Sequence, residues 1–244
     1  MKAIILAAGS AKRLNPLTES TPKCLLSMGN KLIIDYQIEG LIKNEVNEFV
    51  MVVGFQSKKI IKHIKTTYPK ETFTFITNDL YTDTGPAYSL WCANAHLSDT
   101  VLYLNADVLC HADIIKSVIE YPKETVTAIQ HIPWNLEAVN VVTNDSKEII
   151  EIGKHIDEST SCGEFIGVTK IGKAFNSHLI KVLEKFNDQE EVKKFAADSL
   201  HFTIRERGQK MHVLDVTDLP AIEIDTPVDY ADAQKLIKTI DAGL

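Results

Sequence analysis

The sequence predicts an α/β fold in which a mostly parallel sheet is flanked by helices. Apolar, β-rich runs recur through the first half of the chain, at residues 3–7, 48–53, 72–76 and 100–105. Segments with helical spacing separate them, and strand–helix alternation is typical of a parallel sheet with right-handed crossovers. Because the strands are almost continuously apolar, we expect both faces of the sheet to be covered.

Three connections in this half predict helices. The run "KLIIDYQIEGLIKN" (31–44) places apolar side chains at steps of three and four residues, which marks one helical face. The run "SKKIIKHIKTTY" (57–68) repeats this spacing with its isoleucines, and "AYSLWCANAHL" (87–97) predicts a third helix.

After about residue 122 the pattern changes to short strand-like runs separated by turns. We expect these runs to form a small, partly antiparallel β insertion over one end of the sheet, from "TVTAIQHI", "EAVNVVT", "EIIEIG" and "GEFIGVTKI". Further elements are expected as helices at about 173–187 and 191–207, a strand at "MHVLDV", and a last helix from about 227. No linker interrupts the chain, so we expect one continuous domain over residues 1–244.

Composition excludes several classes of partner. The formal net charge of −7 argues against nucleic acid as a main partner. No apolar run approaches the ~20 residues of a membrane span. The four cysteines lack CxxC spacing, which favours free thiols in a reducing compartment and predicts a cytoplasmic protein.

The first strand runs into "LAAGSAKRLNPLTESTPKCLL", from Leu6 to Leu26. A glycine-containing turn after a strand exposes backbone N–H groups that can cradle phosphate oxygens, and Gly9 has no Cβ to block a close approach. Arg13 and Lys23 would supply charge to two different phosphates. The segment lacks the GK[ST] of a P-loop and the G-x-G-x-x-G of a dinucleotide site. Taken by itself, a short "AAG" also fits a structural turn.

The whole segment resembles the "LAAGxGxRLxPLTxxxPKxLL" signature of the sugar-1-phosphate nucleotidyltransferase superfamily. Ala11 departs from it, because the family usually has glycine there. The resemblance covers nearly the full chain and implies a Rossmann-like mixed sheet of the nucleotide-diphospho-sugar transferase type. It implies a nucleotide-binding part at about 1–122 and an acceptor-binding part at about 123–244. The implied catalytic residues are Arg13, Lys23, Asp107 and Asp225.

Two acids far apart in the sequence complete this implied set. Asp107 follows the strand at 100–105, where ligands bind in open α/β sheets, and Asp225 precedes the last helix. Either acid alone also fits a turn or a helix cap. The resemblance implies that Asp107 and Asp225 together hold Mg²⁺, which prefers hard oxygen ligands. Asp229 and Asp232 are expected to be acids of the first helical turn, favoured by the helix dipole.

The segment "NDLYTDTGPAYSLWCA" (78–93) looks like the "NxxYxxTNNxYSLxxA" stretch of the branch that resembles phosphocholine cytidylyltransferases. Gly85 and Pro86 replace the two asparagines. The resemblance implies that this segment lies beside the base and ribose, with Gly85 close to the ring. The nucleotide-binding residues it implies are Leu6, Ala7, Ala8, Gly9, Arg13, Asn78, Gly85, Ser89 and Ala106.

The acceptor side resembles the same branch in "IIEIGKHI", "GEFIGVTKI" and "AADSLH". The resemblance implies Lys154, Glu164 and Asp198 as acceptor-binding residues, while a solvated surface role stays open for Lys154 and Glu164. Trp134 could form one wall of a cation–π site for a quaternary ammonium.

The function implied by the resemblance is transfer of CMP from CTP to a phosphorylated small molecule, with release of pyrophosphate. The acceptor would be phosphocholine-like, an inositol phosphate or a related phospho- or phosphonate compound. A UTP- or dTTP-dependent sugar-1-phosphate nucleotidyltransferase and a non-catalytic nucleotide-binding relative stay open as alternatives. The complete charged set argues against the last of these. The partners are small-molecule substrates, and the sequence leaves open whether the chain forms a homodimer.

Overall fold

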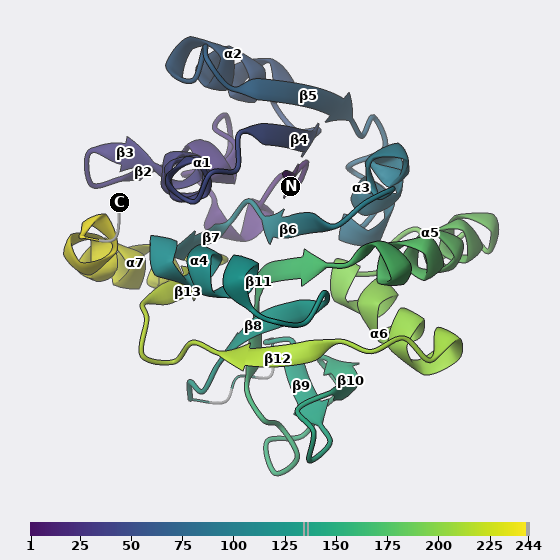
Figure 1. Cartoon of the computed structure of the whole chain (residues 1–244). Coiled ribbons are helices and arrows are strands. Elements are labelled where there is room, and N and C mark those ends of the chain that lie inside the picture. Colours follow the sequence, from purple (N-terminus) through teal and green to yellow (C-terminus); the bar gives the residue numbers. More distant parts are fainter. Residues whose placement is uncertain (134, 136, 243–244) are drawn as a thin grey trace.

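The computed structural model describes residues 1–133, 135 and 137–242 of the chain. Its centre is a mixed sheet of nine strands among these residues, and the order along its main path is β10-β9-β11-β6-β1-β4-β5. Strands from both halves of the chain hydrogen-bond into this one sheet (Figure 1). The α/β fold predicted from strand–helix alternation is confirmed.

The four strands of the first half are parallel. They are β1 (Lys2–Ala7), β4 (Glu48–Val53), β5 (Thr72–Thr77) and β6 (Val101–Asn105). β1 lies between β4 and β6, so its carboxyl end opens at the middle of the sheet. The loop that follows β1 and the turn that follows β6 therefore start side by side.

The later strands extend the same sheet. They are β8 (Val126–Gln130), β9 (Asn140–Thr143), β10 (Ile149–Gly153), β11 (Glu164–Ile171) and β12 (His212–Asp215). β11 runs antiparallel to β6, β8 and β9, while β12 pairs in parallel with β8. The strands expected as an insertion over one end of the sheet thus also continue it, because β11 docks directly on the edge of β6.

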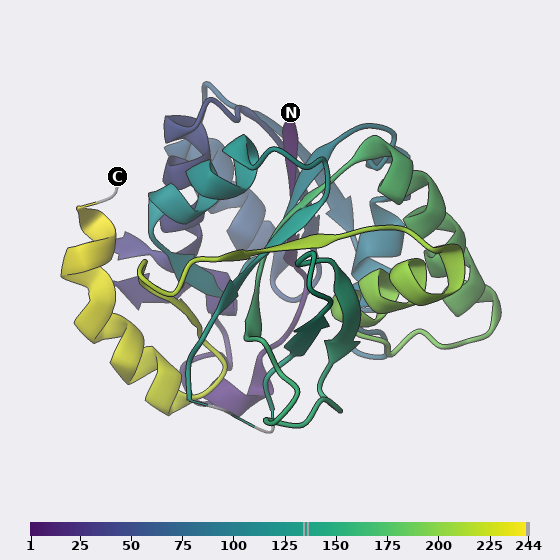
Figure 2. The ribbon, with the colours of Figure 1, turned by 60° about the horizontal axis from the view of Figure 1, so that its bottom comes forward.

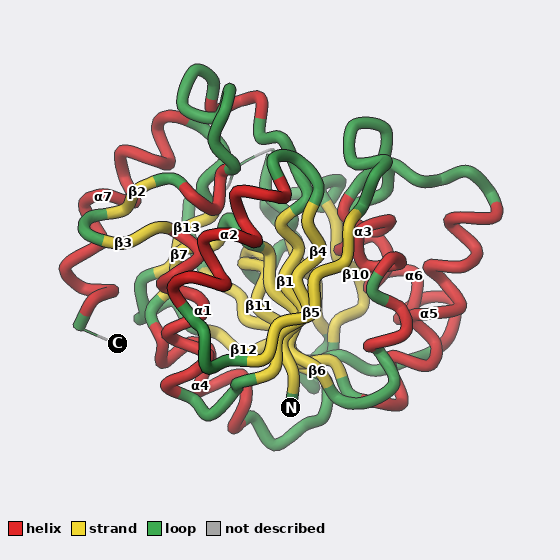
Figure 3. Tube along the Cα trace, turned by 90° about the horizontal axis from the view of Figure 1, so that it is seen from above, coloured by secondary structure: helices red, strands yellow, loops and turns green. Residues whose placement is uncertain are grey.

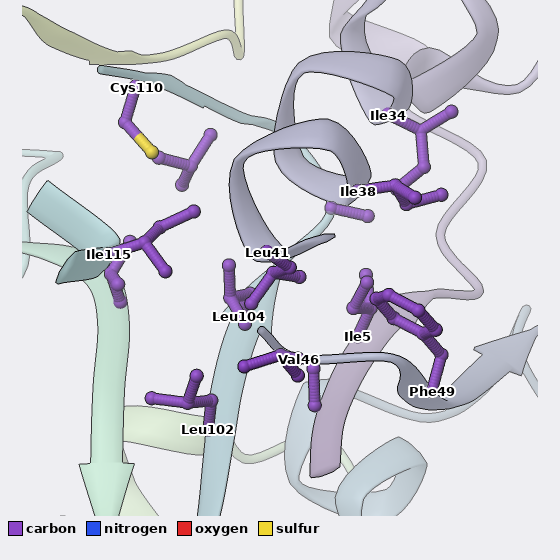
Figure 4. Close-up of a cluster of buried hydrophobic side chains, with 14 of the residues drawn as sticks. Ile5, Ile34, Ile38, Leu41, Val46, Phe49, Leu102, Leu104, Cys110 and Ile115 are labelled. Carbon is purple, nitrogen blue, oxygen red and sulfur yellow. The ribbon is translucent and has the colours of Figure 1, made fainter. Parts of the chain in front are cut away.

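Helices cover both faces of the sheet, as Figure 3 shows from above. On one face lie α1 (Ile33–Lys43), α2 (Ser57–Thr67) and α4 (Ala112–Glu120). On the other lie α3 (Pro86–Cys92), α5 (Lys173–Asp188) and α6 (Ala196–Arg207). Figure 4 shows Ile34, Ile38 and Leu41 of α1 against the sheet residues Ile5 and Leu104. Burial of such side chains stabilises the fold by roughly 1.5–3 kcal/mol each.

A third apolar cluster attaches α7 (Pro227–Asp241) to the side of the sheet, beside the two small ribbons β2–β3 (Ser27–Met28, Lys31–Leu32) and β7–β13 (Val108–Cys110, Ala221–Glu223). Figure 2 shows α7 in yellow beside the purple ribbon β2–β3, and Figure 1 labels α7 near β7 and β13. Short 3₁₀ turns lie at Lys12–Leu14, Lys23–Leu25 and Asn94–His96. The ribbon β7–β13 brings residues that follow Asp107 beside residues that precede Asp225.

One helix differs from its predicted span. The helix expected at 191–207 begins at Ala196, because residues 192–193 form a turn and the carbonyls of Val192 and Lys194 accept hydrogen bonds from the backbone of the α3 segment. None of the helices in the described part of the chain is long and apolar enough to cross a membrane.

Candidate active site

A cavity of about 250 Å³ opens at the carboxyl ends of the parallel strands. Both halves of the chain line it. The lining residues include Leu6, Ala8, Gly9, Arg13, Asn78, Gly85, Ser89, Asn105, Asp107, Val139, Lys154, Phe165, Phe195, Glu223 and Asp225. A second cavity of about 120 Å³ shares Leu6, Gly9 and Asp107 with it and is also lined by Ala7, Lys23 and Ala106. The structure thus brings most of the sequence-predicted nucleotide-binding and catalytic residues to one place.

The loop after β1 is open at Gly9 and tightly folded at Ala11. A Cβ built on Gly9 would meet no atom within 4 Å, so its lack of a side chain leaves room in the cavity. Ala11 adopts the left-handed conformation, with φ of 48°. Its carbonyl accepts hydrogen bonds from the N–H of Leu14 at 3.0 Å and from the hydroxyl of Thr18 at 2.8 Å. Glycine favours this conformation, which gives a physical reason for the family's glycine here.

The charged centre of the site is built around Lys23. Its ammonium lies 2.7 Å from Oδ2 of Asp107 and 2.7 Å from Oδ1 of Asp225. Arg13 donates to the other oxygen of Asp225 at 2.6 Å. Burial opposes the charge of Lys23, but the two carboxylates outweigh it and raise the pKa of the ammonium above its ordinary value. Burial likewise opposes the charge of Asp225, but Lys23 and Arg13 lower the pKa of its carboxyl group.

A third acid joins the two that the sequence predicted. One oxygen from each of Asp107, Glu223 and Asp225 lies within 4.8 Å of the others. Burial, together with the negative charges of Asp107 and Asp225, raises the pKa of Glu223 to about 8. Sequence reasoning missed Glu223, although "EID" offered a signal: side chains two residues apart on an extended segment point the same way.

This cluster fits a divalent cation. Oδ1 of Asp107 is buried and has no hydrogen-bond partner among the described residues. This oxygen is therefore available to bind a cation. Carboxylate oxygens are the ligands that Mg²⁺ prefers. The residues that would hold the ion are Asp107, Glu223 and Asp225.

The two acidic segments are tied together by backbone hydrogen bonds. The N–H of Ile224 donates to the carbonyl of Asp107 at 3.1 Å, and Glu223 pairs with Val108 in the β7–β13 ribbon. Asp229 closes this corner, because its carboxylate accepts from the N–H groups of Asp225 and Thr226 at the start of α7. As predicted, Asp229 is an acid of the first helical turn, whereas Asp232 lies beyond that turn. Its role is to hold the chain that carries Asp225.

Asn78 lines the cavity, but its amide faces the protein. It donates to the hydroxyls of Thr84 and Ser89 at 3.0 and 3.1 Å and accepts from the N–H of Leu80. All three contacts lie within its own segment, and the side chain is only 1% exposed. Asn78 therefore fixes the shape of the segment that the resemblance places beside the nucleotide.

Gly85 is packed under another part of the chain. Its N–H donates to the carbonyl of Val192 at 2.6 Å, and the N–H of Ala87 donates to that of Lys194 at 3.1 Å. A Cβ on Gly85 would lie 2.4 Å from the carbonyl oxygen of Lys194 and 2.6 Å from that of Lys193. The glycine is thus required by contact with residues 192–194, as well as lining the cavity.

The acceptor-side residues lie in different surroundings. Lys154 lines the cavity, with its ammonium 4.9 Å from the ring centre of Phe195 and 3.3 Å from a carboxylate oxygen of Glu137. Glu164 is half-buried at the start of β11 and is not among the cavity-lining residues; burial, aided by Asp229, raises its pKa to about 7.

Asp198 also lies outside the cavity lining. Its carboxylate accepts from the N–H of Phe195 at 2.7 Å and closes the amino end of α6. The sequence pattern could not separate this capping role from contact with a ligand. Trp134, the expected aromatic wall, lies outside the described residues.

Two of the known proteins with similar sequences are named as cytidylyltransferases. The chain is 30% identical over 201 residues to the CTP:phosphoglutamine cytidylyltransferase of Campylobacter jejuni, which covers 75% of this chain and 78% of that protein. It is 38% identical over 107 residues to the choline-phosphate cytidylyltransferase of Streptococcus pneumoniae, an alignment that spans 44% of each chain.

Among solved structures, the inositol-1-phosphate CTP transferase of T. maritima superposes with a TM-score of 0.83 at 22% identity, over 100% of this chain and 97% of that one. At this identity the superposition demonstrates the fold alone. Residues 2–151 match the family described as nucleotidyl transferase. Because this match covers more than half of the 244 residues, the chain belongs to the nucleotidyl transferase family.

Proposed function

We propose that this nucleotidyltransferase transfers CMP from CTP to a phosphorylated small molecule and releases pyrophosphate. The observation that carries the proposal is the cluster of Lys23, Asp107, Glu223 and Asp225 beside the open loop at Gly9. It puts a largely buried cation and three carboxyl groups that could hold a metal ion beside the cavities at the carboxyl ends of the parallel strands.

In the proposed reaction an oxygen of the acceptor phosphate attacks the α-phosphorus of CTP. A new phosphorus–oxygen bond forms as the bond to the pyrophosphate oxygen breaks, with the attacking and leaving oxygens roughly in line. A divalent cation held by the carboxylates would offset triphosphate charge and polarise the phosphate oxygens.

Two cationic side chains of the protein are proposed to bind the phosphate groups. Arg13, whose side chain is about half exposed at the mouth of the loop, binds the β- and γ-phosphates. Lys23 is held between Asp107 and Asp225 and neutralises charge on the α- and acceptor phosphates as the transition state forms. For this, its ammonium must exchange part of its carboxylate contacts for phosphate oxygens.

The choice of cytosine rests on relatives. The Campylobacter and Streptococcus proteins are named as CTP-using enzymes. A UTP–glucose-1-phosphate uridylyltransferase of Haloferax volcanii is also similar, at 28% identity over 66% of this chain, so uracil is the competing base. A pocket that hydrogen-bonds a base edge rejects the wrong edge because buried donors and acceptors lose their partners.

The acceptor is proposed to lie in the cavity beside Lys154 and Phe195, with its phosphate turned toward Lys23. In this position Lys154 would bind an anionic group of the acceptor, and Phe195 would cover an apolar or cationic part of it. Glu164 is proposed to bind an acceptor hydroxyl or ammonium group. Asp198, whose carboxylate caps α6, would act by holding the Phe195 backbone in place.

The test is release of pyrophosphate with CTP, UTP, dTTP, ATP and GTP at equal concentration, each with phosphocholine, inositol 1-phosphate, glucose 1-phosphate and phosphorylated glutamine. We expect CTP to give the highest kcat/KM. A tenfold or greater preference for UTP or dTTP would replace the cytidylyltransferase proposal with the sugar-nucleotide alternative. Asp107→Ala serves as the negative control in every reaction.

A further inference from the structure

The turn that carries Asp107 accepts two hydrogen bonds from a buried side-chain amide. Gln37, in the middle of α1, is completely buried. Its Nε2 donates to the carbonyl of Asn105 at 2.7 Å and to the carbonyl of Val108 at 2.6 Å. These two carbonyls flank Ala106 and Asp107, so both N–H groups of a single side chain close the base of the turn.

The orientation of this amide is fixed by its contacts. Turning it over would place the amide oxygen against two carbonyl oxygens and would lose both hydrogen bonds. In the observed orientation Oε1 of Gln37 is buried without a partner among the described residues. An unpartnered buried acceptor costs roughly 1–3 kcal/mol of stability. In this orientation the two hydrogen bonds donated by Nε2 offset that cost.

The turn also makes backbone hydrogen bonds to two neighbouring segments. The N–H of Ala106 donates to the carbonyl of Leu6, and the carbonyl of Asp107 accepts from Ile224. These bonds tie the turn to β1 and to the Asp225 segment. Strand pairing also holds both sides of the turn, because Asn105 lies opposite Leu6 and Val108 lies opposite Glu223. The carbonyls of Asn105 and Val108 accept hydrogen bonds from the amide of Gln37, which ties the two sides of the turn to each other and to α1.

We infer that Gln37 is a positioning residue for Asp107: its two N–H groups hold the turn so that the Asp107 carboxylate faces Asp225 and Glu223. The inference rests on the proposed role of Asp107 as a cation ligand. Removal of a group that orients a metal ligand through hydrogen bonds typically changes metal affinity by about 10–100-fold.

The fold contains a matched control. Asn176 of α5 is also completely buried, its Nδ2 donates to the carbonyls of Asp99 and Ile171, and its Oδ1 has no partner among the described residues. Asp99 lies before the start of β6, while Asn105 ends it. Gln37 and Asn176 thus make the same kind of contact at opposite ends of one strand, and only Gln37 touches the turn with Asp107.

The experiment measures Mn²⁺ binding to the purified full-length chain by electron paramagnetic resonance, well below the melting temperature. The variants are Gln37→Met and Asn176→Leu, which keep the approximate size of each side chain and remove its donors, together with Asp107→Ala. We expect Gln37→Met to weaken Mn²⁺ binding by about 10-fold, Asn176→Leu to leave it unchanged although it also lowers stability, and Asp107→Ala to lose it.

If Asp107→Ala weakens binding while Gln37→Met binds Mn²⁺ like the wild type, the inference is overturned and the proposed metal role stands. An equal loss in Asn176→Leu also overturns the inference, because general loosening then accounts for it. If Asp107→Ala binds Mn²⁺ normally, the proposed metal role itself fails. Should Gln37→Met fail to fold, Gln37→Glu replaces it: its carboxyl group can donate at most one hydrogen bond, so weaker binding is expected again, and unchanged binding contradicts the inference.

Discussion

The carboxylates of Asp107 and Asp225 each lie 2.7 Å from the ammonium of Lys23. The two acids come from segments that are distant in the sequence and are joined by the hydrogen bond between Ile224 and Asp107. A single, largely buried cation therefore holds two candidate metal ligands together and lies next to the loop that would receive the triphosphate. We therefore expect the positive charge of Lys23 to affect both the rate of catalysis and the stability of the site.

Replacing Lys23 by alanine should affect turnover more than nucleotide binding. Loss of electrostatic help in the transition state typically lowers kcat by about 10²–10³-fold. We expect Lys23→Ala to lower kcat by this amount with little change in the KM for CTP, measured by pyrophosphate release. Lys31→Ala is the control, because Lys31 pairs with Glu39 away from the cavity. A change in KM alone would mean that Lys23 binds only ground-state phosphate.

The same variant predicts a change in stability. Without Lys23, Asp107 loses its ion-pair partner and Asp225 keeps only Arg13. We expect the melting temperature of Lys23→Ala without divalent cations to fall below that of the wild type. Added Mg²⁺ should raise it more in the variant, because a cation then relieves the repulsion among the carboxylates. An equal Mg²⁺ effect in both proteins would count against the ion lying at this cluster.

Glu223 should contribute to cation binding although the sequence did not single it out. We expect Glu223→Gln to weaken Mn²⁺ binding by about 10-fold, since it replaces one of three carboxyl groups of a small cluster, which would bind the ion in its ionised form, with a neutral amide. Calorimetric titration with Mn²⁺ measures this. Asp232→Asn is the control, because Asp232 is an exposed acid of α7 that pairs with Lys235. Equal affinities of Glu223→Gln and the wild type would remove Glu223 from the ligand set.

Two glycines that line the cavity should respond differently to alanine. Gly85→Ala would push a Cβ to 2.4 Å from the carbonyl oxygen of Lys194, so we expect a loss of roughly 1–3 kcal/mol in the free energy of unfolding. The Cβ added by Gly9→Ala would meet no protein atom within 4 Å, so we expect little change in stability. Because this Cβ would occupy part of the cavity, we expect a raised KM for CTP. Denaturant unfolding and initial rates measure the two effects. Equal stability losses would show that the packing argument for Gly85 is wrong.

Glu164 predicts a pH dependence of stability. Burial raises its pKa to about 7 from an ordinary value of 4.5, so between these values the folded chain binds more protons than the unfolded chain. The stability that this group contributes is therefore fully present below pH 4.5 and is lost as the pH rises through 7. Because glutamine resembles the protonated acid, Glu164→Gln should raise the melting temperature relative to the wild type at pH 8 and leave it nearly unchanged at pH 5.

Thermal unfolding at the two pH values measures this difference. Glu158→Gln is the control for removal of one negative charge, since Glu158 lies in an exposed loop. A gain in stability that is equal at pH 5 and pH 8 would contradict the raised pKa of Glu164.

The sequence by itself determined the α/β fold, the loop with Gly9, Arg13 and Lys23, and the candidate pair Asp107 and Asp225. The fold and the loop can be predicted because they depend on local order: apolar runs alternate with helical spacing, and the loop motif is contiguous. The pairing of Asp107 with Asp225 follows only from the resemblance to the nucleotidyltransferase family, since either acid alone also fits a turn or a helix cap. The turn before α6 is not predicted by the helical pattern of the sequence, since its conformation depends on hydrogen bonds to residues 85 and 87.

Only the tertiary structure decided which side chains meet. Glu223 joins the acids because the β7–β13 ribbon places it beside the Asp107 turn, and Gln37 reaches that turn because α1 packs beneath it. Asp198 and Asn78 look like ligands in the sequence, yet their polar atoms bond to the protein around them. Long-range pairing and hydrogen-bond satisfaction are properties of the folded chain, because each depends on a partner that the neighbouring sequence does not contain.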